Sequence, residues 1–214
     1  MNSSVAQTVE ERLVHVPAGS VTLEGNLTLP QGSPAVVLFA HGSGSSRRSS
    51  RNRYVARLLN EAKLATLLID LLTPDEDAID ERTAQLRFNI DLLAERLVDA
   101  TDWLTRYPDS QYLSIGYFGA STGAAAALVA AAERHDVVGA VVSRGGRPDL
   151  AGPALMRVRA PTLLIVGGND GQVIELKVGT KQNQRIVSIR PAESSKGSDF
   201  ALVYIKMRGG KDTI

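Results

Sequence analysis

Five continuous apolar runs occur along the chain, and each is five or six residues long. Runs of this length are typical of strands that are buried on both faces of a sheet. Segments with helical patterning separate them, and alternating strands and helices predict a doubly wound, mostly parallel sheet in an α/β domain. The five predicted strands are residues 35–40, 65–69, 113–118, 137–142 and 161–166.

The segments around these strands have patterns of their own. Apolar and polar residues alternate in 14–16 and 21–29, which predicts an antiparallel β-ribbon near the N-terminus. Residues 54–62 predict a helix, and so do the Ala-rich residues 122–132. Between 82 and 106, apolar residues recur at steps of three and four, which predicts one long helix with a single apolar face.

Composition narrows the class of protein. A chain of 214 residues with 43% hydrophobic residues and a mean hydropathy of −0.04 predicts one soluble domain over residues 1–214. The net charge of +1 gives no reason to expect a nucleic-acid or membrane partner. No cysteine is present, which excludes disulfides and a cysteine nucleophile. Residues 1–12 carry no apolar run of the kind a signal peptide needs, so we expect a cytoplasmic protein.

The last part of the chain differs from the rest. Residues 171–214 contain eight Lys or Arg against four Asp or Glu, and they show little helical periodicity. Residues 185–189 and 201–205 predict short strands at best. The sheet edge beyond residues 161–166 is then incomplete, and exposed apolar surface there favours a homo-oligomer.

A serine lies in a glycine-rich turn between a predicted strand and a predicted helix. The turn reads Gly119-Ala-Ser121-Thr-Gly123. Small residues around a serine at this position allow a sharp turn that lifts the hydroxyl above the edge of the sheet, as in serine hydrolases. The alternative is a glycine-rich turn in which the serine has no function. A serine hydroxyl needs a base within hydrogen-bond reach to act as a nucleophile.

Two further turns follow strands at the same edge of the sheet. His41-Gly42-Ser43-Gly44 predicts an oxyanion hole formed by the backbone N–H groups of Ser43 and Thr122. We expect His41 and Gly42 to contact substrate, although His41 in such a loop more often supports the backbone. Arg144 is a third predicted substrate contact, with a turn held by an ion pair as the alternative.

Acidic residues follow two other strands. Asp170 closes an apolar strand and fits the acid of a Ser-His-Asp triad, which orients the histidine and stabilises its cation. An Asx-turn or a helix N-cap is the alternative for this position. Asp70 and residues 74–77 predict an acidic loop at the edge of the pocket.

Together these motifs resemble the dienelactone hydrolase-related branch of the α/β-hydrolase superfamily. The resemblance is carried by His41-Gly-Ser-Gly44, by the serine turn and by Val166-Gly-Gly-Asn-Asp170, and it covers about residues 10–176. It is strongest with small bacterial hydrolases that are sometimes fused to a phosphoribosyltransferase domain. The resemblance implies an α/β-hydrolase fold and hydrolysis of a small ester, lactone or thioester by Ser121. It also implies Asp170 as the triad acid and no metal or organic cofactor.

One expected residue is missing. The family has a histidine in a loop beyond the acid, but the three histidines of this chain are His15, His41 and His135. The expected loop falls at residues 193–196, and the resemblance stops after residue 176. This abrupt change favours a frameshifted or rearranged C-terminus over 177–214.

The missing histidine leaves two functions open. One is an impaired serine hydrolase, and the other is a non-catalytic protein of the same fold that binds a ligand or a partner. A phosphoribosyl-transfer module is disfavoured, because no acidic pair followed by a phosphate-binding loop occurs in the chain.

Overall fold

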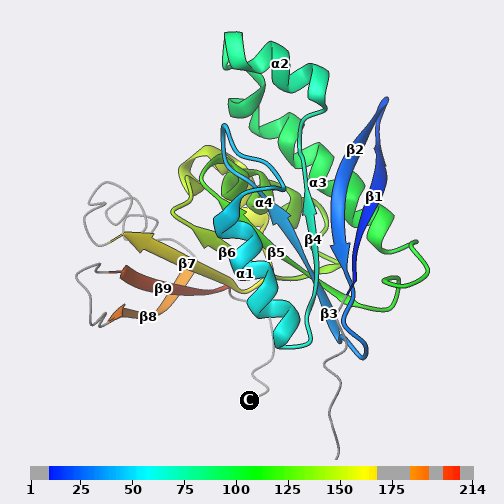
Figure 1. Ribbon diagram of the computed structural model, residues 1–214. Helices are drawn as coiled ribbons and strands as arrows, with labels where there is room; N and C mark the ends of the chain where they lie inside the picture. The colour runs from blue at the N-terminus through cyan, green and yellow to red at the C-terminus, as the bar shows by residue number, and fades with distance from the viewer. Residues whose placement is uncertain (1–9, 168–183, 193–199, 208–214) are drawn as a thin grey trace, which may run out of the picture.

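The computed structural model describes residues 10–167, 184–192 and 200–207, and these form one sheet with helices on both faces (Figure 1). The strand order is β1-β2-β4-β3-β5-β6-β7-β9-β8. The central strands β4, β3, β5, β6 and β7 are parallel, and an antiparallel pair flanks them on each side. The strands are β1 (Glu11–Ala18), β2 (Val21–Thr28), β3 (Ala35–Ala40), β4 (Ala65–Ile69), β5 (Ser114–Ala120), β6 (Val138–Arg144), β7 (Thr162–Gly167), β8 (Gln184–Ala192) and β9 (Phe200–Met207).

The five predicted central strands are confirmed, and so is the N-terminal ribbon. Ala18 pairs with Val21, so β1 and β2 are joined by a tight turn in which Gly19 has a φ of 57°. Strands β3 and β4 coincide with their predicted ranges. The uninterrupted apolar runs form strands because both faces of the sheet centre are covered.

Two hydrophobic clusters lie on opposite faces of the sheet. Helix α1 (Ser50–Glu61) covers one face, where Ala56 packs with Phe39, Leu68 and Phe118. The larger cluster lies on the other face, beneath α3 (Ile90–Leu104) and α4 (Thr122–Glu133). Every residue of α4 from Thr122 to Ala132 is buried, which explains its alanine-rich sequence.

The predicted long helix over residues 82–106 is wrong. The chain instead forms α2 (Pro74–Thr83), a short 3-10 helix η1 (Leu86–Phe88) and then α3. Ala84 adopts a left-handed φ of 54° that ends α2, and the Asn89 side chain caps α3 by accepting from the Leu92 N–H. Local capping chemistry therefore divides a segment whose apolar spacing suggested continuity.

The acidic segment predicted as a loop is the first turn of α2. Thr73 caps the helix, Glu76 completes the capping box, and Pro74 occupies the first turn. Acidic side chains are favourable here because the N-terminus of a helix carries partial positive charge.

The predicted open edge at β7 is also wrong, because β9 pairs antiparallel along the whole of β7. β8 and β9 form a hairpin, so the two short strands predicted over 185–189 and 201–205 are confirmed. The outermost strand on this side is β8. Unpaired apolar surface at β7 is therefore no reason to expect self-association.

Among the helices of the described residues, we find none with the length and apolar character that crossing a bilayer requires.

Candidate active site

Ser121 lies at a sharp turn between β5 and α4. Its φ and ψ angles are 51° and −124°, a conformation that L-residues with a Cβ rarely adopt. Such backbone strain costs of the order of 1–3 kcal/mol and clusters at functional sites. Ser121 is exposed, whereas Thr122 beside it is only 2% exposed. The turn therefore presents the serine hydroxyl above the sheet, as the sequence predicts.

Two glycines allow this turn to form. A Cβ on Gly119 would lie 2.5 Å from the Ala124 Cα, and one on Gly123 would lie 2.3 Å from the His41 carbonyl oxygen. Both contacts are with backbone atoms, which cannot move aside as a flexible side chain can. The motif thus needs glycine at both positions so that α4 can pack against β5 and β3.

The loop between β3 and α1, residues 41–49, lies directly against the serine turn. A Cβ on Gly42 would approach the Ser121 Cβ to 2.9 Å. The Ser43 hydroxyl lies 3.0 Å from the Thr122 hydroxyl, which ties the loop to the start of α4. The Thr122 N–H has no acceptor within its helix, since the first N–H groups of any helix lack one. The two predicted oxyanion donors, Ser43 and Thr122, are therefore brought together beside Ser121.

Both ring nitrogens of His41 are used by the backbone. Nε2 accepts a hydrogen bond of 3.0 Å from the Leu71 N–H, so Nδ1 carries the proton and donates to the Gly42 carbonyl, also at 3.0 Å. Burial lowers the pKa of His41 below its ordinary value of 6.5, and the ring is neutral at pH 7. His41 supports the loop, and neither nitrogen is available to take a proton from Ser121. Substrate contact by His41 and Gly42 stays a prediction.

Arg144 lies beside the serine turn, at the end of β6. It is in register with Ala120 on β5. Its Nε is buried and has no hydrogen-bond partner in the part of the chain that the structure describes. Burial, and then the nearby charge of Arg51, lower the pKa of Arg144. The predicted ion pair in this turn exists, but Arg147 forms it with Asp149 at 2.6 Å, and substrate contact by Arg144 stays a prediction.

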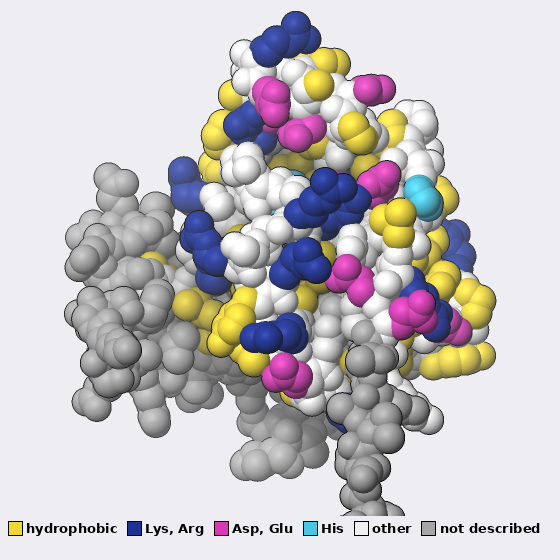
Figure 2. Space-filling model, viewed as in Figure 1, with side chains coloured by type: hydrophobic (Ala, Val, Ile, Leu, Met, Phe, Trp, Pro, Cys, Tyr) yellow, Lys and Arg dark blue, Asp and Glu magenta, His cyan; other side chains and the backbone are white. Residues whose placement is uncertain are grey.

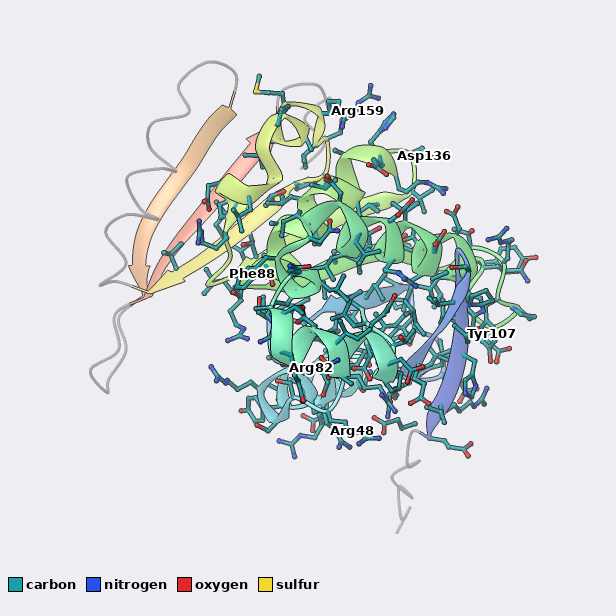
Figure 3. All side chains as sticks on the ribbon, turned by 90° about the horizontal axis from the view of Figure 1, so that it is seen from above. Arg48, Arg82, Phe88, Tyr107, Asp136 and Arg159 are labelled. Carbon is teal, nitrogen blue, oxygen red and sulfur yellow. The ribbon has the colours of Figure 1, made fainter. Side chains whose placement is uncertain are left out.

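The structure does not describe the other two members of the predicted triad. Asp170, the predicted acid, lies outside the described residues, and so does the loop at 193–196 where the histidine is expected. Residue 176, where the resemblance ends, lies outside them as well. His15 lies on β1, where it pairs with Glu24 of β2. His135 follows α4, and the 12 residues of that helix span about 18 Å, so it lies at the opposite edge of the sheet from Ser121. Figure 3 shows its neighbour Asp136 at the rim of the molecule, well apart from Phe88. Phe88 belongs to η1, which contacts the loop beside Ser121 through Arg87 and Ser43.

No base is therefore placed at Ser121 by residues 10–167, and no hydrogen-bond partner of its hydroxyl is found among the residues described. Within the same ranges, no group of three or more His, Asp or Glu side chains is arranged to hold a metal ion.

Comparison with known proteins decides the family. A solved dienelactone hydrolase from Anabaena variabilis is 65% identical to this chain, covers 79% of each chain and superposes with a TM-score of 0.78. The chain belongs to the dienelactone hydrolase family. A dienelactone hydrolase-like phosphotriesterase from metagenomic libraries is 20% identical with a TM-score of 0.63, and this likeness supports the α/β-hydrolase fold alone. No protein-family model matches the chain.

Longer relatives also match. Proteins from two strains of Mycobacterium tuberculosis, named as phosphoribosyl transferases, are 57% identical to this dienelactone hydrolase family member over 180 residues. The match covers 84% of this chain but 38% of those proteins, so the chain spans well under half the length of these curated relatives.

Sequence reasoning missed Asp80, which anchors the 3-10 helix beside the site. Its side chain is 1% exposed and accepts hydrogen bonds from the Leu86 N–H at 2.6 Å and from the N–H and guanidinium of Arg87. The Arg87 carbonyl in turn accepts from the Ser43 hydroxyl at 3.4 Å. Helix α2 has no apolar face to indicate which of its carboxylates is buried, so the sequence gives no signal for this role.

Asp80 predicts a dependence of stability on pH. Its hydrogen bonds with Arg87 and the Leu86 N–H outweigh the effect of burial and lower its pKa below the ordinary 3.8. The stability it contributes is therefore full above pH 3.8 and is lost as the pH falls through the lower pKa of the folded state. Urea unfolding from pH 6 to pH 2.5 should show wild type more stable than Asp80→Asn at pH 6, with the difference narrowing below pH 4. A constant difference would contradict this role.

Proposed function

We propose that the chain is a serine hydrolase in which Ser121 attacks a small ester, lactone or related acyl compound. The observation that carries the proposal is the conformation of Ser121, an exposed serine in a strained turn, with Thr122 next to it held at 3.0 Å from the Ser43 hydroxyl. Membership of the dienelactone hydrolase family supports the same reaction class.

The reaction would proceed in two steps. The Ser121 Oγ forms a bond to the carbonyl carbon of the substrate, and the N–H groups of Ser43 and Thr122 stabilise the oxyanion. The bond to the leaving oxygen then breaks, and the serine proton ends on the released alcohol. Water next attacks the acyl-serine, which releases the carboxylic acid and restores the serine hydroxyl.

Both steps need a group that moves protons. We propose Asp170 as the acid that would orient a histidine, in line with the order serine then acid along the chain. No histidine follows His135 in the sequence, and His41 is held by the backbone on both nitrogens. We therefore propose that hydrolysis by this chain is impaired. Arg144, His41 and Gly42 are the proposed substrate contacts.

The same missing base favours a second candidate. A protein that keeps the fold without a base would bind a ligand or partner and leave it intact. Because the chain spans 38% of the relatives named as phosphoribosyl transferases, that name does not extend to it. A cytoplasmic location, and the absence of nucleic-acid and membrane partners, stay predictions from composition.

Turnover of p-nitrophenyl acetate separates the two candidates. We expect slow hydrolysis by wild type that falls to the buffer rate in Ser121→Ala, because the acyl group then has no acceptor. Ser114→Ala is the matched control, since Ser114 is an exposed serine at the start of β5, the strand that ends just before Ser121. Equal rates for wild type and Ser121→Ala would favour the binding protein.

A further inference from the structure

Arg47 differs from the other arginines around it. The sequence places Arg47, Arg48, Arg51 and Arg53 together as a basic face, and Figure 2 shows basic side chains gathered over α1. Arg51 and Arg53 are exposed, but the Arg47 side chain is only 9% exposed. A buried guanidinium needs acceptors for its donors, so Arg47 has a different role from its neighbours.

The donors of Arg47 meet acceptors on β2 and at the end of β4. Its backbone N–H donates to Asp70 Oδ1 at 2.6 Å, and its guanidinium donates to Asp70 Oδ2 through Nη1. Nε donates to the Asn26 side chain at 2.9 Å, and Nη2 donates to Glu24 at 2.5 Å. The fixed fork of arginine suits this set, which the single ammonium of a lysine could not satisfy.

Residues 70–71, which follow β4, also hold the other end of the loop. His41, at the start of the loop, accepts from the Leu71 N–H, and the Asp70 N–H donates to the Glu24 carbonyl at 3.0 Å. The loop is thus attached to residues 70–71 at both ends. Gly42 and Ser43, which contact the serine turn, lie between the two attachments.

We infer that Arg47 is a positioning residue whose contacts with Asp70, Glu24 and Asn26 fix the β3–α1 loop and hold the Ser43 N–H in place beside Ser121. This inference rests on the proposed role of Ser43 as an oxyanion donor. Removing one oxyanion donor typically lowers the rate by about 10²–10³-fold, and a misplacement of about 1 Å costs about 10²-fold. A loosened loop misplaces the oxyanion donor, so it lowers the maximal rate more than the affinity, to which Gly42 of the same loop contributes as a proposed substrate contact.

The test follows two properties of Arg47→Met. The first is the rate of Ser121 labelling by a fluorophosphonate, resolved into the binding constant and the maximal rate. We expect the maximal rate to fall by about 10- to 100-fold, from the range above, and the binding constant to change by a smaller factor. The second is amide hydrogen exchange, which should accelerate in residues 42–48 and stay unchanged in β5 and α4.

Matched variants make the result specific. Arg47→Lys keeps the charge without the fork, so we expect an intermediate rate. Arg48→Met is the control, because Arg48 lies at the outer rim of the molecule (Figure 3) and forms no ion pair with any described residue. Asp70→Asn should lower the rate less than Arg47→Met, because Arg47 then keeps its hydrogen bonds to Glu24 and Asn26. The double variant should lose less than the product of the two single effects, because the two side chains share a contact.

Two outcomes would overturn the inference. One is that Arg47→Met is labelled, and exchanges its amide hydrogens in residues 42–48, at the same rates as wild type. The other is that Arg48→Met loses as much labelling rate as Arg47→Met. If wild type itself takes no label, the serine-hydrolase proposal fails, and exchange in residues 42–48 still decides whether Arg47 holds the loop. Circular dichroism and urea unfolding of each variant separate a loosened loop from an unfolded protein.

Discussion

Hydrolysis of p-nitrophenyl acetate by the 214-residue chain is expected to be about 10⁴- to 10⁶-fold slower than by a serine esterase with a complete triad. The expected loss of rate comes from the missing base. The serine turn is formed and the Ser43 hydroxyl lies against Thr122, but His41 is held by the backbone and His135 lies at the opposite edge of the sheet. The values of kcat/KM for the two enzymes, measured side by side, test this expectation.

Added imidazole should restore part of the missing rate. A positioned base contributes about 10²–10⁴-fold, so a freely diffusing imidazole is expected to restore on the order of 10-fold. The stimulation must be absent in Ser121→Ala, which corrects for hydrolysis by imidazole alone. Full triad-like turnover without imidazole would contradict the expectation, since it would require a base that the chain supplies in another way.

Replacing Gly123 by alanine is expected to lower the free energy of unfolding by about 3 kcal/mol, the upper part of the range for overpacking. The added Cβ would lie 2.3 Å from the His41 carbonyl oxygen and 2.4 Å from the Ala40 carbonyl oxygen. Relieving these contacts moves α4 away from β3, and α4 is buried along its length. Urea unfolding measures the loss.

Gly139→Ala is the matched control for this change. Its Cβ would meet nothing closer than the Ile115 carbonyl at 3.7 Å, an ordinary contact, and the position is exposed on β6. We expect its effect to stay within about 0.5 kcal/mol. If Gly123→Ala were as stable as Gly139→Ala, the close packing of the serine turn would be contradicted.

The central strands could be predicted from sequence because burial on both faces leaves uninterrupted apolar runs, as in β3 and β4. The helix boundaries around residues 84–89 could not. There the left-handed Ala84 and the Asn89 cap decide where α2 ends and α3 begins, and apolar spacing is insensitive to both. The pairing of β9 with β7 depends on contacts distant in sequence, which a local pattern does not report.

The candidate site also has a part that the sequence could predict and a part that it could not. The proximity of Ser43 and Thr122 to Ser121 was predictable, because glycine-rich turns after buried parallel strands lie at one edge of the sheet. The roles of Arg47 and Asp80 were not, because each depends on which of several similar charged residues is buried. His41 was predicted to support its loop, and the two backbone hydrogen bonds explain how it does so.

The identity of the nucleophile is tested most directly by treating the chain with a fluorophosphonate and locating the adduct by tandem mass spectrometry. A serine held in this strained turn should form one adduct, on Ser121, and Ser121→Ala should form none while Ser114→Ala labels like wild type. A wild-type chain that takes no label, or takes it on another residue, would contradict the role of Ser121 as the nucleophile.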